Sequence, residues 1–211
     1  YIMVAAREGG PDLEYNAALR SAVEKAKAAS MPNENIDRAI KKGAGETDGA
    51  SFSEFTYEGY GPGGVAVLVE ILTDNKNRAA ADVRSYFTKC DGNLGANGCV
   101  SFMFDHKGVL VIDRTEEMDE EEVMMQVLEA GAEDFVAEET HFEIYTEVSD
   151  FAAVRDALKV DGFEFSMAEL RYLPQTTTKL TDADQLKKMN KLIDSLEDSD
   201  DVQNVYHNWE E

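Results

Sequence analysis

The hydrophobic period of this chain changes at a polar, turn-rich stretch from Gly45 to Ser53, which is typical of a linker. Before this stretch, apolar residues recur at helical spacings of three and four, and after it short β-branched runs alternate with amphipathic segments. A length of 211 residues leaves room for one large domain or for two to three small ones. We therefore expect an α+β multidomain protein that begins with a helical bundle.

Helical spacing in the N-terminal part predicts two complete helices. Asp12 is the candidate N-cap of a helix that runs to about residue 30, and Pro32 stops it. A second helix follows from about residue 33, with Gly43 as its candidate C-cap. The opening residues, Tyr1 to Val4, are typical of the end of an apolar helical turn. We therefore expect a three-helix unit whose first helix is mostly absent from this chain, with more sequence upstream.

The segment after the linker is predicted to form strands and helices in the order β-α-β-β. Residues 73–75 are candidate caps for its helix, and His106 to Gly108 is predicted to form a tight turn between its last two strands. The predicted elements are a strand at 64–72, a helix at about 77–89, a strand at 100–104 and a strand at 109–112.

A second unit is predicted to interrupt the first. Its order is α-β-β-α-β, and Val123, Val127 and Leu128 are expected to face inward on its first helix. The helix at 182–196 and the strand at 202–207 then supply what the first unit lacks. The predicted organisation is a helical domain at 1–48, a discontinuous ferredoxin-like α/β domain at 49–114 and 176–211, and a second ferredoxin-like domain inserted at 115–175.

The charge of the chain is unevenly distributed. The formal net charge is −23, which argues against general affinity for nucleic acid, because phosphates are repelled by such a field. Residues 1–45, however, hold seven basic and six acidic residues, so they carry +1 and the remainder carries −24. Any polyanion is therefore expected to contact the N-terminal helices.

Composition also limits where the protein works. The apolar runs are far shorter than the roughly 20 residues that span a bilayer, and no signal-peptide pattern opens the chain. Cys90 and Cys99 are the only cysteines, which does not suggest a secreted disulfide scaffold, and we expect two free thiols. These features predict a cytoplasmic protein, or a mitochondrial-matrix protein if the source is eukaryotic, without contact to a membrane.

No catalytic constellation is recognisable, so we expect a protein that is not an enzyme. The glycine-rich stretch from Tyr57 to Gly64 precedes a strand, whereas a phosphate-binding loop follows one, and a turn that sets the entry to the strand is expected. The three histidines are far apart, and no metal or cofactor is expected. The weakest alternative is an enzyme with its cleft between residues 61–64 and the pair Asp74 and Arg78.

The remaining signal is basic. Arg38, Lys41 and Lys42 are spaced i, i+3 and i+4 and share one helix face, which suits phosphate contacts. Ion pairs of Glu34 with Arg38 and of Asp37 with Lys41, which would only stabilise the helix, are the alternative interpretation. For Arg78, at a predicted helix N-terminus, helix capping is the alternative to an anion site. The full set of candidate nucleic-acid-binding residues is Arg20, Lys25, Lys27, Arg38, Lys41, Lys42 and Arg78.

Several long motifs of this chain resemble those of the YebC family, and the resemblance covers the whole chain. The motifs are Val4 to Asp12, Ala22 to Pro32, Asn35 to Gly43, Tyr57 to Ala66, Thr73 to Arg78, Gly92 to Gly95 and Val202 to Asn208. The resemblance implies three domains, namely an N-terminal helical bundle and two small α/β domains, one inserted in the other. Members of the family also begin with a short Lys/Arg-rich leader that this chain lacks.

The resemblance implies a regulator of gene expression, in one of two forms. The first is a cytoplasmic transcriptional regulator that binds DNA. The alternative is a ribosome-associated translation factor that binds ribosomal RNA, as mitochondrial relatives are described as translational activators. The absence of a recognition-helix signature mildly favours the alternative. In either case we expect nucleic acid as the partner, with the ribosome as a further one, no small-molecule substrate, and a monomer.

Overall fold

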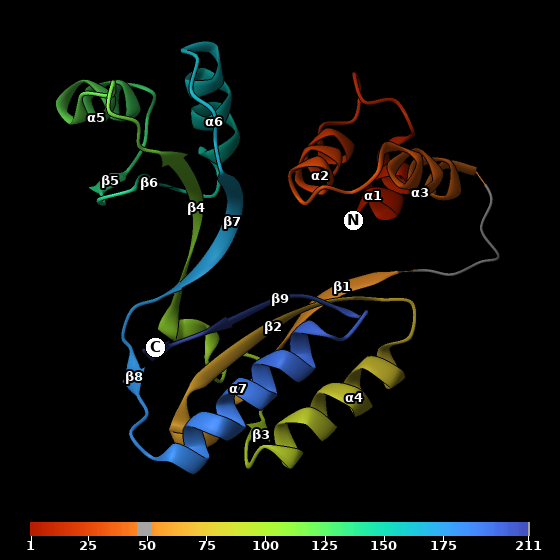
Figure 1. Ribbon diagram of the computed structural model, residues 1–211. Coiled ribbons are helices and arrows are strands. Elements are labelled where there is room, and N and C mark those ends of the chain that lie inside the picture. The colour runs from red at the N-terminus through yellow and green to blue at the C-terminus, as the bar shows by residue number, and fades with distance from the viewer. Residues whose placement is uncertain (46–51, 211) are drawn as a thin grey trace.

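The computed structural model describes residues 1–45 and 52–210, and within them the protein is a mixed α/β structure (Figure 1). Three helices form one body, and the rest of the chain forms two four-stranded sheets with helices packed on them. The predicted linker lies mostly outside the described residues. No described helix combines the length and the hydropathy that crossing a bilayer needs.

The N-terminal body, which we call the helical head, consists of residues 1–45. Its helices are α1 (Ile2–Gly9), α2 (Ala17–Ala28) and α3 (Asn33–Gly45). Their apolar stripes meet in a small core of Ile2, Ala5, Ala6, Leu19, Val23 and Ile36. Helix α1 contributes Ile2, Ala5 and Ala6 to this core, so it packs against α2 and α3 as the expected third helix of the unit.

Two caps in the head differ from those predicted. Asn16, not Asp12, caps α2, because its side chain accepts a hydrogen bond from the Leu19 amide at 2.9 Å. The same side chain donates to the carbonyls of Ala5 at 2.7 Å and Gly10 at 2.8 Å, so it joins α1, the connecting loop and α2. The buried side-chain amide of Asn16 therefore stabilises the packing of the head, and the sequence pattern alone did not indicate it.

The other wrong cap is Gly43, which lies inside α3 rather than at its end. A Cβ on Gly43 would collide with the Met3 carbonyl oxygen and lie 2.9 Å from the Cβ of Ala6. The glycine is therefore required for the close approach of α1 and α3, and not for a left-handed turn. This close contact fixes which side of α3 is turned outward.

The first sheet has the strand order β3-β1-β2-β9, and every pair is antiparallel. Its helices α4 and α7 pack against the same core, whose fully buried members include Val69, Phe87, Met189 and Leu192. The elements are β1 (Ser53–Tyr60), β2 (Ala66–Thr73), α4 (Lys76–Lys89), β3 (Asn93–Leu94), α7 (Ala183–Glu197) and β9 (Val202–His207).

The second sheet has the order β5-β6-β4-β7, again antiparallel throughout. Its elements follow in the chain as β-α-β-β-α-β, which is the order of a ferredoxin-like unit. Leu110, Ile112, Phe142 and Ile144 form its core with apolar residues of both helices. The elements are β4 (Phe104–Asp113), α5 (Glu120–Glu129), β5 (Asp134–Ala137), β6 (His141–Thr146), α6 (Phe151–Val160) and β7 (Met167–Pro174).

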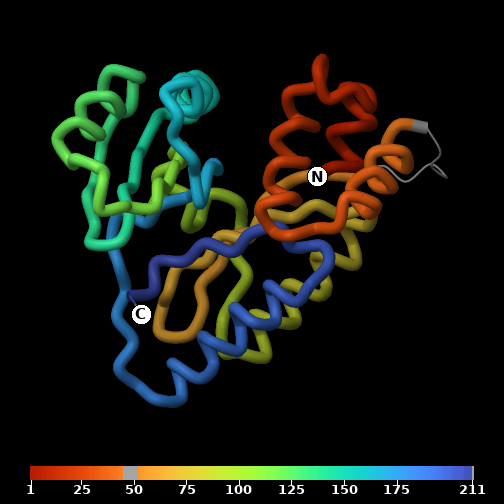
Figure 2. Tube along the Cα trace, turned by 45° about the horizontal axis from the view of Figure 1, so that its top comes forward, coloured from red at the N-terminus to blue at the C-terminus, as the bar shows by residue number. Residues whose placement is uncertain are grey.

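Short elements lie between and after the strands of the two sheets. Single 3-10 turns cover Pro62–Gly64 and Ser101–Met103, and two further strands, β8 (Thr178–Lys179) and β10 (Trp209–Glu210), pair in parallel. The tube trace shows how the C-terminal segment returns to the first sheet after the second one is complete (Figure 2). The prediction that α7 and β9 complete the first sheet is therefore confirmed.

The predictions for β1, for β4 and for the order of the first sheet are wrong. β1 begins at the last residue of the predicted linker and includes the first four residues of the predicted glycine-rich turn, of which only residues 62–64 form a turn. The expected turn at His106 to Gly108 lies inside the continuous strand β4, which pairs with β6 and β7 and not with the first sheet. The second sheet thus begins at Phe104, earlier than the expected boundary at residue 115, and the order of the first sheet is not ferredoxin-like.

Candidate nucleic-acid interface

Three cations lie together on the outer face of α3. Ile36 is buried and Ala39 and Ile40 pack beside it, so this side of the helix faces the head core. Arg38, Lys41 and Lys42 lie on the opposite side, and all three are exposed. The helical spacing predicted from the sequence therefore does bring these residues onto one surface, which we call the α3 face.

The described acidic neighbours on α3 do not pair with the cations of the α3 face. Among residues 1–45 and 52–210, no ion pair or hydrogen bond joins Arg38, Lys41 or Lys42 to Glu34 or Asp37. The alternative interpretation, in which i,i+4 pairs engage these side chains, is therefore not what this structure contains. Long cationic side chains that hold no partner are able to contact phosphates without first breaking an ion pair.

A shallow hollow adjoins the same face. Arg38 and Lys42 border it together with Asn35, and Met3 and Ala39 are its apolar neighbours. Its volume is about 290 Å³. The close α1–α3 contact at Gly43 holds Met3 in this position, so the hollow depends on the packing of the head.

The α2 cations are arranged differently. Arg20 donates to the carbonyls of Leu13 at 3.1 Å and Glu14 at 3.0 Å, so it closes the loop before α2. Lys25 forms an ion pair with Glu169 of β7, while Lys27 is exposed and makes no ion pair within the part of the chain that is described. Of the three sequence-based candidates on α2, two already make internal contacts, and Lys27 alone makes none with the described side chains.

Polar contacts dock α2 against the second sheet and its helices. Besides the pair of Lys25 with Glu169, Lys159 of α6 bonds to Glu24 at 3.0 Å, and Arg155 of α6 donates to Ser21 at 3.3 Å. Both views place α2 between α3 and the second sheet (Figures 1 and 2). The α3 face is therefore directed away from this strongly acidic part of the protein.

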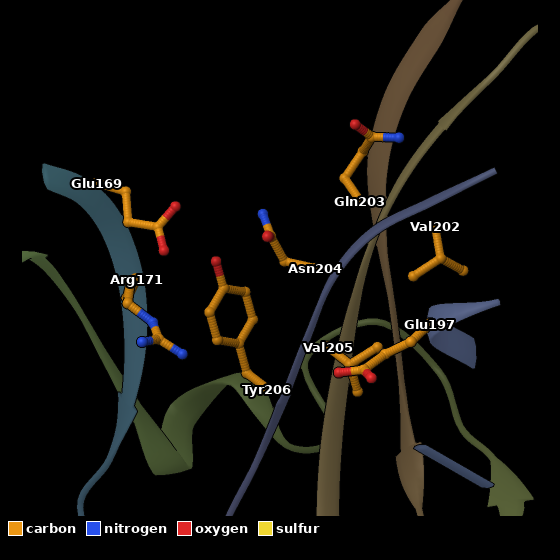
Figure 3. Close-up of a pocket in the computed structure, with 8 residues that line it drawn as sticks. All are labelled: Glu169, Arg171, Glu197, Val202, Gln203, Asn204, Val205 and Tyr206. Atoms are coloured by element: carbon orange, nitrogen blue, oxygen red, sulfur yellow. The ribbon is translucent and has the colours of Figure 1, made fainter. Parts of the chain in front are cut away.

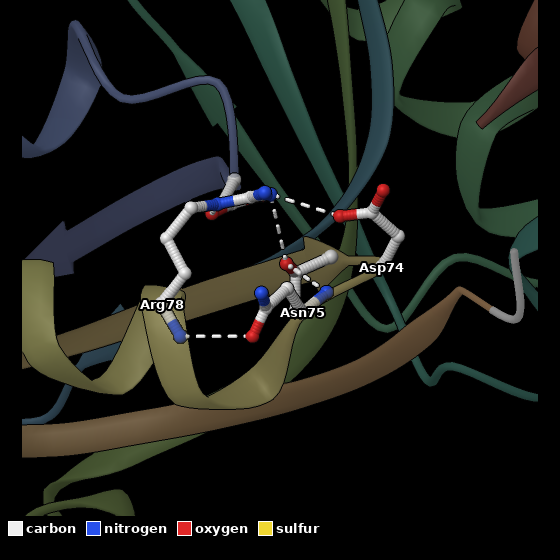
Figure 4. Close-up of polar contacts among 5 residues, drawn as sticks. Asp74, Asn75 and Arg78 are labelled. Atoms are coloured by element: carbon white, nitrogen blue, oxygen red, sulfur yellow. Dashed lines mark hydrogen bonds and ion pairs between the residues drawn. The ribbon is translucent and has the colours of Figure 1, made fainter.

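Arg78 lies elsewhere and is held by two carboxylates (Figure 4). Its guanidinium donates to both carboxylate oxygens of Asp201, at 3.0 and 2.7 Å, and to Asp74 at 2.9 Å. Hydrogen bonding to Asp201, and then to Asp74, raises the pKa of Arg78 above its ordinary value, and the same bond lowers the pKa of Asp201. Asn75 caps α4 through the Arg78 amide, as predicted. Arg78 therefore connects the start of α4 to the start of β9.

The cleft considered for an enzyme does not exist. Residues 61–64 precede β2, whereas Asp74 follows its last residue, Thr73. Eight residues of extended chain separate the two groups, which is on the order of 26 Å at about 3.3 Å per residue. The glycines instead shape the turn between β1 and β2, where Gly63 and Gly64 have φ values of 67° and 82°.

A second hollow, of about 280 Å³, lies between β7 and β9 (Figure 3). Glu169 and Arg171 project into it from β7, and Asn204 and Tyr206 approach from β9. With Glu197 also at its border, carboxylates outnumber the single guanidinium. This balance of charge makes the hollow unsuitable for a phosphate group.

Potential metal and thiol chemistry is sparse in the described part of the chain. No group of three His, Cys, Asp or Glu residues there has a geometry that would hold a metal ion. Cys90 and Cys99 are both free thiols, and burial is the main cause that raises the pKa of each. Thiols of this kind are poor nucleophiles at neutral pH.

The fold and this surface define an acidic, mixed α/β protein that presents a cluster of exposed cations on a small helical head. The chain belongs to the TACO1/YebC family. A model of the TACO1/YebC protein N-terminal domain matches residues 1–46, and a model of the TACO1/YebC second and third domain matches residues 52–209.

Relatives of known name match over almost the whole chain. A probable transcriptional regulatory protein of Clostridioides difficile is 61% identical over 209 residues, which cover 99% of this chain and 87% of the relative. A probable transcriptional regulatory protein of Acetivibrio thermocellus is 57% identical over 208 residues, which cover 99% of this chain and 86% of the relative. The crystal structure of a conserved hypothetical protein from Aquifex aeolicus is similar to this chain, with a TM-score of 0.84 and 47% sequence identity. The match covers 99% of this chain and 86% of the Aquifex chain.

Proposed function

We propose that this protein is a DNA-binding transcriptional regulator that contacts the phosphate backbone through the α3 face. The names of the relatives at 61% and 57% identity support a regulatory role in transcription. The observation that carries the proposal is that Arg38, Lys41 and Lys42 share one exposed helix face and make no ion pair with any residue of 1–45 or 52–210. Such cations are suited to position a protein on nucleic acid without reading its sequence.

The other candidates take subordinate places in this proposal. Lys27 offers a further exposed cation on α2, and Arg20 closes the loop before that helix. Lys25 contributes only when its ion pair with Glu169 opens. We leave Arg78 out of the contact surface because Asp201 and Asp74 occupy its donors.

The charge of the whole molecule supports this orientation on DNA. The chain carries a net charge of −23, so any approach by the acidic sheets would be repelled by the duplex. An approach through the head places α2 and the width of the head between the duplex and the second sheet (Figure 1). Since the relatives are bacterial, a regulator of this kind would act in the cytoplasm.

The proposal is tested by fluorescence anisotropy with a labelled 30-bp duplex over a range of salt concentrations. Each phosphate that a cation neutralises contributes about −0.9 to the slope of log K against log salt, so three contacts predict a slope of about −2.7. Replacing Arg38, Lys41 and Lys42 by Glu is expected to abolish binding at physiological salt. The control replaces Lys179, Lys187 and Lys191 by Glu, which changes the net charge equally at exposed positions outside the head.

Equal loss of affinity in both triple variants would show that net charge, rather than the α3 face, determines binding. The same measurement with a structured RNA separates the two kinds of regulator. Much tighter binding to RNA than to duplex DNA, together with sedimentation of the protein with ribosomes, would replace the proposal by a ribosome-associated translation factor.

A further inference from the structure

Helix α5 carries large apolar side chains on its solvent side. Val123 and Val127 are buried and attach the helix to the second sheet. Met124, Met125 and Leu128 are exposed by 39%, 60% and 46%, respectively. Leu128 was expected to face inward, so the sequence-based prediction for this residue is wrong.

These three side chains form one continuous surface, which we call the α5 face. Leu128 is four residues from Met124 and three from Met125, so it neighbours both methionines on the helix surface. A single exposed apolar residue is ordinary, but a contiguous group is a mark of an interaction site. Methionine suits such a site because its unbranched, polarisable side chain adapts to different partners.

The surroundings of the α5 face are uniformly acidic. Between Arg114 and His141 the chain holds eleven acidic residues and no lysine or arginine. Glu121 lies on the same side of α5 as the apolar group, and Glu129 follows directly after Leu128. Arg114, the basic residue before this segment, is already paired with Glu120 at 3.0 Å. An apolar centre with an acidic rim is complementary to a partner surface that has an apolar centre and a basic rim.

We propose that the α5 face docks a basic amphipathic helical segment of another protein. The apolar side of that segment covers Met124, Met125 and Leu128, and its lysines or arginines pair with the surrounding glutamates. This arrangement stands apart from the nucleic-acid contact of the head. A nucleic acid is repelled by this rim, and a second copy of this chain would bring two acidic rims together.

Methyl NMR of the full chain, labelled with ¹³C at the methionine methyl groups, tests the proposal directly. The probe is an 18-residue helical peptide of leucine and lysine with one apolar side, and the control peptides are a scrambled sequence and a leucine–glutamate counterpart. Among the eight methionines, Met124 and Met125 are expected to shift on addition of the probe. Met189, which is buried, and Met31, which is exposed on the head, serve as internal references.

Affinity measurements on variants complete the test. Met125→Gln with Leu128→Gln keeps the charge and is expected to weaken probe binding about tenfold or more, because the apolar contact is lost. The matched control, Val148→Gln with Val160→Gln, alters apolar side chains that are 38% and 87% exposed away from α5, and should bind as the wild type does.

Three outcomes would overturn the proposal. The first is equal affinity of the Met125/Leu128 variant and the wild type. The second is equal binding of the probe and the scrambled peptide, since that would reflect net charge alone. The third is a shift confined to Met31 or to other methionines outside α5.

Discussion

Replacing Glu58 by Gln is expected to destabilise the first sheet, because this carboxylate holds a loop from within the protein. Glu58 is only 4% exposed. One of its oxygens accepts from the Gly98 amide at 2.8 Å, and the other accepts from the amides of Val100 and Ser101 at 2.9 and 2.8 Å. The loop of residues 98–101 leads from β3 to β4 and therefore connects the two sheets.

The magnitude follows from which of these bonds a glutamine is able to keep. Its single carbonyl oxygen can accept from two amides, but its NH₂ group then faces the third donor, which loses its partner. An unsatisfied buried donor costs about 1–3 kcal/mol, and the two remaining bonds lose the benefit of charge. A total of about 2–4 kcal/mol is expected, which lowers the urea midpoint by about 1–2 M for a typical dependence on denaturant.

The effect also depends on pH. Burial alone would raise the pKa of Glu58, but the hydrogen bonds from Gly98, Val100 and Ser101 lower it below its ordinary value of 4.5. A carboxyl whose folded pKa is depressed contributes stability above its unfolded pKa and loses it as the pH falls through the folded value. The difference between wild type and Glu58→Gln should therefore be constant above about pH 5.5 and shrink below about pH 4.5.

The fluorescence of Trp209, the single tryptophan, is the appropriate signal, because this residue packs against the core of the first sheet. Glu164→Gln is the matched control, since Glu164 is exposed and makes no hydrogen bond within the described residues. A midpoint for Glu58→Gln that equals that of Glu164→Gln, or a difference that stays constant down to pH 3.5, would refute the reasoning.

Two further predictions concern the helical head. Gly43→Ala should lower the free energy of unfolding by about 1–3 kcal/mol, because the collision with α1 outweighs the better helix propensity of alanine. The melting temperature followed by circular dichroism should fall accordingly, and a raised melting temperature would contradict this prediction. Asn16→Ala should lower the free energy of unfolding by about 2–4 kcal/mol, since it removes the hydrogen bond that caps α2 at Leu19 and the two bonds to the carbonyls of Ala5 and Gly10. Hydrogen exchange as slow as in the wild type at the start of α2 would contradict this.

The helices were predictable from the sequence because the apolar side of each faces one core. The strands β1 and β4 were not predictable. β1 alternates as strands do, since Phe55 and Tyr57 pack on the first core. Gly59 within β1 and Gly61 directly after it, however, also suit a turn. Gly108 suits a turn as well, but a Cβ there would lie 2.5 Å from Phe151 and closer still to Thr146, so it is required by packing across the second sheet.

The candidate site was predictable only in part, for a related reason. The spacing of Arg38, Lys41 and Lys42 determines that they share a face, and no other part of the chain is needed to see it. The partners of Lys25 and Arg78 could not be inferred, because Glu169 and Asp201 are 144 and 123 residues away in the sequence. Which cations stay available is thus a property of the tertiary structure.

The interleaved order of the two sheets has a consequence for biosynthesis. All strands of the second sheet lie between residues 104 and 174, so this unit can fold as soon as that stretch has left the ribosome. The first sheet must wait for β9, whose residues 202–207 are made after the whole of the second sheet. Until then β2 exposes an unpaired edge of buried, β-branched residues, and a nascent chain in that interval is open to misassociation.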